Sequence, residues 1–196
     1  MGMKLIAITG GIGSGKSVVA RMLKVMGYEV YDCDSRAKAL MTQSVDVRHR
    51  LVEAFGNETY LDDGTLNREH LSKVAFGDKE ALARLNGIVH PATATDLQQW
   101  AARQASSGAS KAFVETALLR TASLDRLVDD VWHVTAPDEV RVKRVMARSG
   151  LTASQVMDRI ASQRHEEVVA PGEQAIVNDN GTALLPQVIK LLSHSN

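Results

Sequence analysis

The stretch GGIGSGKS, from Gly10 to Ser17, decides the fold of this chain. It fits the pattern G-x-x-x-x-G-K-[ST], in which glycines form a loop whose backbone N–H groups surround phosphate oxygens. The lysine of such a loop reaches the β- and γ-phosphates of a nucleotide, and the hydroxyl after it binds Mg²⁺. Here those residues are Lys16 and Ser17. The alternative is a glycine-rich turn that precedes Lys-Ser by chance.

The residues on either side of the loop favour phosphate binding over a chance match. Leu5 to Ile8 form a continuous apolar run, which is typical of a strand buried on both faces of a parallel sheet. After the loop, apolar residues recur at the spacing of one helix face, and Gly27 can end that helix. These residues are Val19, Met22, Leu23 and Met26. Strand, loop and helix therefore predict an α/β fold with a nucleotide site.

We expect the loop and the start of the helix to hold the phosphates of ATP, because the free N–H groups and dipole of a helix N-terminus favour anions. The residues expected to bind ATP in this segment are Gly11, Ile12, Gly13, Ser14, Gly15, Lys16, Ser17 and Val18. Lys16 is also expected to act in catalysis, since a cation there stabilises the transferring phosphoryl group.

Two carboxylates follow the second predicted strand. Glu29 to Tyr31 reads as this strand, and Asp32 and Asp34 come directly after it, at the edge where parallel α/β sheets bind ligands. Phosphoryl transfer to an alcohol needs a carboxylate that orients the hydroxyl and accepts its proton. The alternative is that one aspartate caps the next helix. Both roles are compatible, with the second aspartate capping the helix or holding a metal-bound water.

The composition is that of a globular protein with one domain and an insertion. Of the 196 residues, 44% are hydrophobic, and Lys+Arg and Asp+Glu are both 23, so no global positive field favours nucleic acid. The single cysteine, Cys33, excludes an intrachain disulfide and fits a reducing compartment. No signal peptide and no apolar run of roughly 20 residues is found, so we expect a cytoplasmic protein outside the membrane. The sequence leaves the oligomeric state open.

Residues from Ser35 to about Ser106 have a helical pattern without a convincing strand, which predicts a helical insertion between two sheet strands. A kinase of this architecture would keep its acceptor site there. The expected elements are a helix with Val47, Leu51 and Phe55, a turn at 62–65, a short helix with Leu71, Val74 and Phe76, a helix at 79–85, and a long segment from Pro91 through Trp100. By themselves, Arg68 reads as a solvated charge and His90 as a packed side chain.

The sheet is expected to resume after a linker at 105–110, with strands at 112–114, 131–134 and 176–177 and a closing helix at 184–192. Pro137 can lie in the first turn of a helix, and Thr152 with Gln155 forms a capping box for the next. This region carries the cations Arg141, Lys143, Arg144, Arg148, Arg159 and Arg164. Such a cluster is usually a solvated face, but a phosphotransferase needs one or two cations on a mobile arm to stabilise the transferring group.

In these segments the chain resembles the dephospho-coenzyme A kinases, which transfer the γ-phosphoryl of ATP to the ribose 3′-hydroxyl of dephospho-CoA in the last step of coenzyme A synthesis. The resemblance extends over nearly the whole length. It rests on ITGGIGSGKS at 8–17, the D-x-D of Asp32 and Asp34, DGTLNR at 63–68, His90-Pro91, Ala136-Pro137, RSGL at 148–151, Gln163 and Asn180-Gly181. Many NTPases share the phosphate loop, whereas these motifs together, in this order, are highly specific.

The resemblance implies a P-loop NTPase-type parallel sheet flanked by helices, formed by residues 1–35 and 107–196, with a helical lid at about 141–172. Residues 36–106 become the helical substrate-binding domain. It favours Asp34 over Asp32 as the general base and places Asp32 with Ser17 near Mg²⁺, although the spacing alone does not decide between the aspartates. By the same resemblance, Arg68 and His90 join Asp34 in binding substrate, Arg144 and Arg148 are the catalytic cations of the lid, and Arg148 and Asn180 contact ATP.

Two segments depart from the family pattern. Residues 117–121 read A-L-L-R-T where the family commonly has P-L-L-F-E, so the usual glutamate is missing and Glu115 is a candidate replacement in the substrate site. Residues 164–174 read R-H-E-E-V-V-A-P-G-E-Q where the family often has a P-x-E-E-K-type run with more basic residues. Neither departure touches the loop or the aspartates, so we expect an active enzyme with altered contacts around the acceptor or the lid.

Two other functions remain open at this point. A kinase of the same fold that acts on a nucleoside or a sugar would share the loop and a carboxylate, but it should lack the D-G-x-L-x-R and His-Pro motifs. A nucleotide-binding regulatory protein would transfer nothing and could dispense with the D-x-D. A GTPase switch would also need an N-K-x-D motif to read the base, and the sequence has none.

Overall fold

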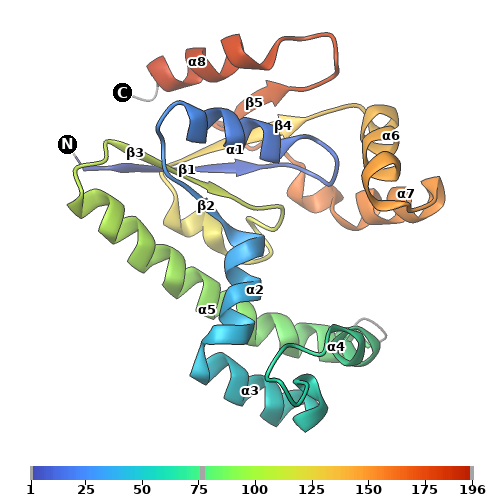
Figure 1. The fold of residues 1–196 in the computed structure, drawn as a ribbon. Helices are drawn as coiled ribbons and strands as arrows, with labels where there is room; N and C mark the ends of the chain where they lie inside the picture. Colours follow the sequence, from blue (N-terminus) through green and yellow to red (C-terminus); the bar gives the residue numbers. More distant parts are fainter. Residues whose placement is uncertain (1, 76–77, 195–196) are drawn as a thin grey trace. The chain divides into compact units, whose positions relative to one another are not determined.

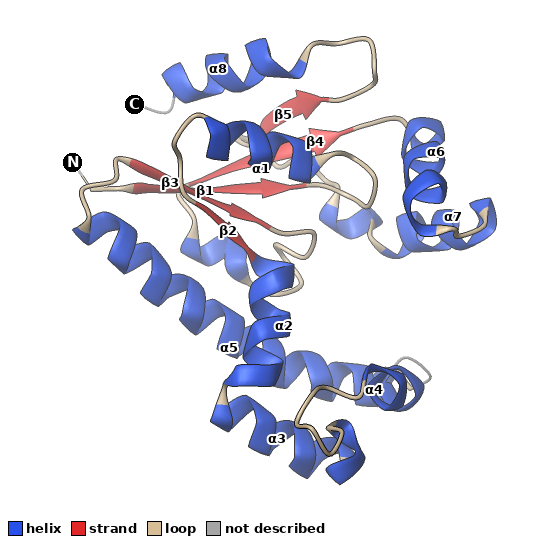
Figure 2. Cartoon of the chain, in the orientation of Figure 1, coloured by secondary structure: helices blue, strands red, loops and turns tan. Residues whose placement is uncertain are grey.

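A five-stranded sheet with helices packed against it forms one part of the chain, and the other part is helical (Figures 1 and 2). The computed structural model describes residues 2–75 and 78–194. Its strands are β1 (Lys4–Thr9), β2 (Val30–Asp32), β3 (Lys111–Glu115), β4 (Asp130–Thr135) and β5 (Gln174–Val177). Its α-helices are α1 (Lys16–Val25), α2 (Cys33–Gln43), α3 (Val45–Phe55), α4 (Arg68–Ala75), α5 (Lys79–Ser106), α6 (Asp138–Ser149), α7 (Ala153–Ser162) and α8 (Leu184–His194). Short 3-10 turns are η1 (Asn57–Thr59), η2 (Leu124–Leu127) and η3 (Arg164–Glu166).

Strand β1 lies at the centre of the sheet, whose order is β2-β3-β1-β4-β5. It pairs in parallel with β3 and β4, and β4 pairs in parallel with β5. This arrangement confirms the predicted parallel α/β sheet. Because all of these strands run the same way, the loops that follow them meet at one edge of the sheet, where ligands bind in this type of fold. The phosphate loop follows the central strand at that edge.

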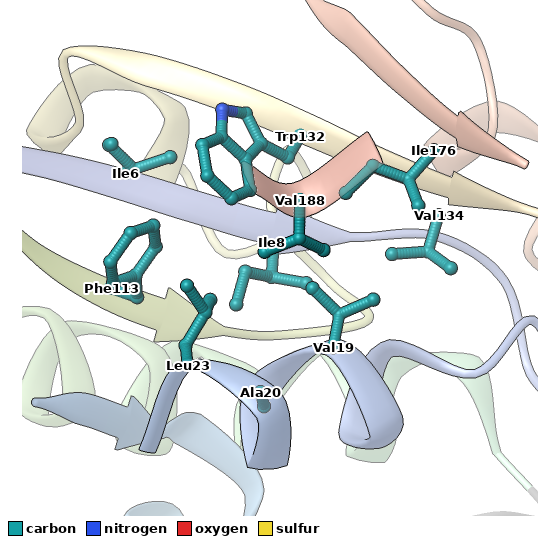
Figure 3. Close-up of a cluster of buried hydrophobic side chains, with 10 residues drawn as sticks. All are labelled: Ile6, Ile8, Val19, Ala20, Leu23, Phe113, Trp132, Val134, Ile176 and Val188. Carbon is teal, nitrogen blue, oxygen red and sulfur yellow. The ribbon is translucent and has the colours of Figure 1, made fainter. Parts of the chain in front are cut away.

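One face of the sheet is covered by α1 and α8 (Figure 3). Val19, Ala20 and Leu23 of α1 and Val188 of α8 pack against buried side chains from four strands. These strand residues are Ile6, Ile8, Phe113, Trp132, Val134 and Ile176. The rings of Phe113 and Trp132 lie 5.2 Å apart in a tilted arrangement. This core fixes the direction in which α1 leaves the phosphate loop.

The backbone contacts divide the chain into two compact units, Met1–Tyr31 with Ala101–Asn196, and Asp32–Trp100. The second unit has its own small core, in which Val47 and Leu51 of α3 pack with Ile88 of α5. Within it, the Arg36 guanidinium binds the Asp96 carboxylate through two hydrogen bonds of 2.7 and 2.8 Å. The roles of the two units in catalysis and substrate binding stay predictions. Phe76, expected in the short helix, lies outside the described residues.

The structure corrects the expected interruption near Pro91. Instead of separate helices and a linker that starts at residue 105, α5 is one helix of 28 residues with Pro91 inside it. A proline removes one backbone hydrogen bond, but buried side chains before and after it, such as Val89 and Leu97, keep both halves in the helix. Despite this length, no helix in the described part of the chain is apolar enough to cross a bilayer.

The structure confirms one expected helix end and corrects another. Helix α1 ends at Val25 with Met26, 37% exposed, as its C-terminal cap, and Gly27 follows with a φ of 90°, which confirms that this glycine ends the helix. The chain reverses there, because the Gly27 N–H donates to Lys24 O and the Tyr28 N–H donates to Leu23 O. Pro137 precedes α6 as its N-cap instead of lying in its first turn. The capping box of Thr152 and Gln155 is confirmed.

The packing of α1 leads to a test of the core. Leu23 is fully buried whereas Val25, two residues later, is 89% exposed. We expect Leu23→Ala to lower the free energy of unfolding by about 2–5 kcal/mol, because it removes buried apolar surface and leaves a cavity. Val25→Ala should change it by less than about 0.5 kcal/mol. Denaturant unfolding of both variants measures the difference, and equal losses would contradict this placement of α1.

Candidate active site

The phosphate loop connects the end of β1 with the first turn of α1. Lys16 is the first residue of this helix, and its Nζ donates to Gly10 O at 2.8 Å and Gly11 O at 3.2 Å. Gly15 has a φ of 101°, in the left-handed region that favours glycine, and a side chain there would overlap the Asn178 amide. The loop therefore needs glycine at this position for two independent reasons.

The outward carbonyl groups of the loop are held by side chains from the C-terminal half of the chain. Arg141 Nε donates to Ile12 O at 2.8 Å, and Asn178 Nδ2 donates to Ser14 O at 2.7 Å. Arg144 Nη1 lies 3.4 Å from both Gly13 O and Ser14 O. Because neighbouring N–H and C=O groups are fixed relative to one another, holding the carbonyls outside orients the amides of the loop.

Ile12 attaches the loop to α6 and α7. Its side chain packs against the buried cluster of Val145, Val156 and Ile160. Its backbone N–H donates to Gln163 Oε1 at 2.8 Å, at the end of α7. Since Arg141 holds the carbonyl of the same residue, apolar and polar contacts together bind this part of the loop to the α6–α7 pair.

Arg141 supports the phosphate loop from a buried position, where two carboxylates surround its guanidinium. Its side chain is only 3% exposed, and it pairs with Glu167 at 2.6 Å and with Asp138 at 3.1 Å. A side chain at Gly11 would overlap both Arg141 and Glu167, so this ion pair lies directly against the loop backbone. Of the cations in the predicted cluster, Arg141 is therefore an anchor for the loop.

Arg144 and Arg148 were predicted as cations of the lid, and the structure gives them different surroundings. The Arg144 guanidinium contacts Asn180 Oδ1 at 2.5 Å and both oxygens of Asn178 at 3.1 Å, so it joins the loop to the turn after β5. Arg148 lies in the last turn of α6 and is exposed. Arg144 and Asn180 thus lie beside the loop, whereas no contact of Arg148 with the loop is found among the described residues.

Glu115 lies at the same sheet edge as the loop. It is the last residue of β3 and pairs in register with Ile8 of β1, two residues before Gly10. It is half-buried. Its position fits a carboxylate near a bound nucleotide or acceptor, and its function stays a prediction.

The two segments that depart from the family pattern contact each other. The Glu166 carboxylate is buried and accepts from the backbone N–H groups of Arg120 at 3.0 Å and Thr121 at 2.7 Å. Burial raises the pKa of Glu166, but the hydrogen bonds from Thr121 and the two backbone amides outweigh it, so the pKa is lowered overall. The Arg120 guanidinium pairs with Glu173 at 2.8 Å. One departure therefore supplies a cation and the other supplies its carboxylate partner.

His133 of β4 completes this cluster. It is fully buried, and its Nε2 lies 3.1 Å from Glu173 Oε2 and 3.5 Å from Arg120 Nη1. Burial lowers the pKa of His133, Glu173 raises it and Arg120 lowers it, with a net lowering. The imidazole is therefore neutral at neutral pH.

The predicted acceptor-side residues Asp34, Arg68 and His90 belong to the second unit. Asp32, at the end of β2, caps α2 by accepting from the Ser35 N–H at 3.1 Å, which confirms the capping alternative for one aspartate. Asp34 then lies in the first turn of α2 and is exposed. Arg68 is exposed at the start of α4, and His90 is half-buried in α5.

The turn before Arg68 is built by side-chain contacts that the sequence did not reveal. Asp63 Oδ1 accepts from the backbone N–H and the hydroxyl of Thr65, and these bonds lower the pKa of Asp63. Arg48 Nη1 donates to Gly64 O at 2.7 Å and its guanidinium stacks 3.9 Å from the Tyr60 ring centre. The D-G-x-L-x-R motif thus has a structural part, the turn at 63–65, as well as the predicted ligand Arg68.

Two residues were predicted to hold Mg²⁺. Ser17 is exposed in the first turn of α1 and presents a hydroxyl, whereas both carboxylate oxygens of Asp32 accept hydrogen bonds from Ser35, so a role for either residue at a metal stays a prediction. Within residues 2–75 and 78–194, no group of three or more His, Cys, Asp or Glu side chains could hold a metal by itself. In a kinase Mg²⁺ needs few protein ligands, because water and phosphate oxygens supply most of its coordination.

A phosphate loop after the central strand of a 2-3-1-4-5 parallel sheet defines the class of P-loop kinases. The family model described as dephospho-CoA kinase matches residues 4–183. Dephospho-CoA kinases from Porphyromonas gingivalis and Salinibacter ruber are 38% and 39% identical to the chain, over 97% and 92% of its length and over 93% and 90% of theirs. The chain therefore belongs to the dephospho-CoA kinase family, and its activity is that phosphotransfer, the final step of coenzyme A biosynthesis.

Solved structures agree with this fold. A crystal structure from Thermus thermophilus has a TM-score of 0.79 and 30% identity, and the similarity covers 100% of this chain and 97% of that one. Dephospho-CoA kinase from Campylobacter jejuni has a TM-score of 0.72 at 22% identity, with 97% and 96% covered. A shikimate kinase from Acinetobacter baumannii has a TM-score of 0.53 at 14% identity, with 98% and 93% covered. The last two show the fold alone.

The sequence interpretation missed several residues of the site. Asn178, Glu167 and His133 had no role assigned. Asn178 donates to the loop, Glu167 pairs with its support Arg141, and His133 lines a cavity that also borders the loop. Arg120 and Glu173 are opposite charges in the two segments that depart from the family pattern, but a single sequence gives no signal that they contact each other.

The position of Arg141 gives a prediction about stability. Arg141→Gln should lower the free energy of unfolding by about 3 kcal/mol, because it leaves the Glu167 carboxylate without its buried partner. Arg159→Gln, which changes an exposed arginine of α7, should change it by less than about 0.5 kcal/mol. Chemical denaturation of the two variants measures both effects. If Arg141→Gln were as stable as the control, the ion pair would not anchor the loop.

The lowered pKa of His133 gives a prediction about pH. In the unfolded chain histidine has a pKa of about 6.5, so below this pH protonation favours the unfolded state over a buried neutral imidazole. The free energy of unfolding should therefore fall as the pH is lowered from 7 to 5, with a contribution from His133 of at most about 1.4 kcal/mol per pH unit. His133→Gln should show a smaller slope than the unchanged protein. Identical slopes in denaturant titrations at several pH values would contradict the assignment.

Proposed function

We propose that the chain transfers the γ-phosphoryl group of ATP to the ribose 3′-hydroxyl of dephospho-CoA, with the phosphates held by the loop at 11–18. The observation that supports this is the loop itself, whose carbonyls are tied outward by Arg141, Arg144 and Asn178 while Lys16 lies at its rim. Amides oriented in this way stabilise phosphate charge without reorganising during the reaction.

On the acceptor side, we propose Asp34 as the general base. Asp32 is occupied with the cap of α2, whereas Asp34 is exposed in the first turn of the same helix. A carboxylate that accepts the hydroxyl proton as the bond to phosphorus forms accelerates transfer to an alcohol. Arg68 and His90 would bind the acceptor together with Asp34, and Glu115 would supply the carboxylate missing from residues 117–121.

We propose that Ser17, with Asp32 through a water, holds the Mg²⁺ that accompanies ATP. When bound there, Mg²⁺ would neutralise negative charge on the phosphates of ATP. The chain's own part is to present the Ser17 hydroxyl at the start of α1, next to Lys16. Asn180 would contact ATP from the turn after β5.

Residues 141–172 are proposed to act as the lid. Two features support this role, namely the attachment of α6–α7 to the loop through Ile12 and the cation Arg144 beside it. Arg148 would reach the phosphates only when the lid moves, since it is exposed in this structure. Closure would exclude water, which otherwise competes with the acceptor for the phosphoryl group.

The test of this function is an acceptor assay. Purified protein with ATP and Mg²⁺ should release ADP when dephospho-CoA is added, and should release little with adenosine or sugar alcohols. Lys16→Ala should abolish turnover, because it removes the charge that stabilises the transferring group. Turnover with a different alcohol alone would identify another small-molecule kinase, and ATP binding without any turnover would identify a regulatory protein.

The role of Asp34 is tested separately. Asp34→Asn should lower kcat by about 10² or more, because the amide cannot accept the hydroxyl proton. Asp125→Asn, which changes an exposed aspartate of η2 in the other unit, is the matched control and should leave kcat unchanged. If Asp34→Asn kept nearly full activity and Asp32→Asn lost it, the base would be Asp32.

A further inference from the structure

A small cavity lies between the phosphate loop and the end of β4. It offers about 70 Å³ to water-sized molecules. Its walls include Gly10, Ser14, His133, Thr135, Arg141 and Glu167. The cavity therefore borders both the loop and the cluster that His133 forms with Glu173 and Arg120.

Two residues that line this cavity have buried polar atoms without a partner. Ser14 is 1% exposed and His133 is 0% exposed, yet Ser14 Oγ and His133 Nδ1 have no hydrogen-bond partner within the described residues. Thr9 Oγ1 is in the same situation, and Thr9 pairs in register with His133 across β1 and β4. Native proteins rarely leave such groups unsatisfied, and in polar cavities ordered water usually satisfies them.

We propose that this cavity is a structural water site that joins the phosphate loop to His133. A cavity holds a water when the centre of a water-sized sphere has about 10–15 Å³ to move in, so this cavity has ample room for one or two. The Nε2 edge of the His133 ring is used by Glu173 and Arg120, which leaves Nδ1 as the ring atom that needs a partner. A water bonded to His133 Nδ1 and Ser14 Oγ would satisfy both atoms.

The charges around the cavity favour water over an ion. Arg141 and Glu167 both line it, but they pair with each other at 2.6 Å, so their charges largely cancel. His133 is neutral, because burial lowers its pKa. A cation would be repelled by the Arg141 guanidinium, and an anion would be repelled by the Glu167 carboxylate. A neutral molecule that both donates and accepts hydrogen bonds is repelled by neither group.

The site would make His133 a positioning residue for nucleotide binding. Asn178 holds the carbonyl of Ser14 at 2.7 Å, and the water would hold its hydroxyl, so this residue would be fixed at two points. This inference rests on the proposed function, since it assumes that the loop binds the phosphates of ATP.

Two substitutions of His133 separate the water contact from the contact with Glu173. The side-chain amide of asparagine lies near the place of Nδ1, so His133→Asn keeps a polar group toward the cavity and loses the one toward Glu173. The longer glutamine places its amide near Nε2, so His133→Gln does the opposite. Both variants carry an uncharged side-chain amide. They should therefore differ mainly in whether residue 133 keeps its contact with the water or its contact with Glu173.

The readouts are a high-resolution crystal structure and the affinity for ADP, measured by calorimetry. We expect one or two ordered waters within hydrogen-bond distance of Ser14 Oγ in the unchanged protein and in His133→Asn, and none bridging to residue 133 in His133→Gln. ADP binding should be about two- to ten-fold weaker in His133→Gln, which is the effect of one lost hydrogen bond, and within two-fold of normal in His133→Asn. A dry cavity, equal affinities of the two variants, or the reverse order would overturn the proposal.

Ser14→Ala removes the other end of the bridge and gives an independent check. It should weaken ADP binding by a factor similar to His133→Gln, and the double variant should show no further loss, because both changes break the same bridge. Additive losses would overturn the proposal. The acceptor assay separates this inference from the proposed function, since a protein that phosphorylates dephospho-CoA but has a dry cavity would refute only the water site. A protein without ADP binding would refute the proposed function, and the crystal structure would still decide whether the cavity holds water.

Discussion

The orientation of a few peptide groups in the phosphate loop is the constraint on which the rest of the structure depends. A loop can surround phosphate with N–H groups only if the carbonyls of the same peptides turn outward and find donors there. In this chain the donors are side chains far along the sequence, Arg141, Arg144 and Asn178. The order of the strands explains why these side chains lie next to the loop. Strands β4 and β5 end at the same edge of the sheet as β1, and they are followed by α6 and by Asn178.

This arrangement makes α6–α7 a support of the loop, and the lid role proposed for this segment would be coupled to that support through one residue. Ile12 belongs to the loop, yet its side chain packs in the small core of α6 and α7 and its backbone is bound by Arg141 and Gln163. Any movement of this segment must therefore either carry the loop with it or break these contacts. As the proposed lid, a segment attached to the loop in this way would respond to nucleotide binding without a separate sensor.

The segments that depart from the family pattern show how a site can keep its shape when its residues change. Arg120 brings a positive charge into the loop after β3, and Glu173 and the buried Glu166 supply carboxylates from the segment before β5. Arg120 without Glu173, or Glu173 without Arg120, would be a charge without its partner in a partly buried place, which is unfavourable. Together they form a cluster with His133, next to the supports of the phosphate loop.

The sequence by itself determined the parallel α/β core, the phosphate loop and the family, because these follow from local patterns: an apolar run, glycines at fixed spacing and a helical face. The sequence also predicted most helices of the insertion. Its predicted interruption of α5 at Pro91 was wrong, because buried side chains on both sides of the proline keep the two halves in one helix. The sequence was compatible with a catalytic role and a helix-capping role for the two aspartates, and the structure shows that Asp32 is the cap. Only the tertiary structure decided which cations anchor the loop, that Arg120 meets Glu173, and that Ser14 and His133 border one cavity. Those contacts join residues that are far apart in the chain, by 53 positions for Arg120 and Glu173 and by 129 for Arg141 and Ile12, and no local pattern encodes such a distance.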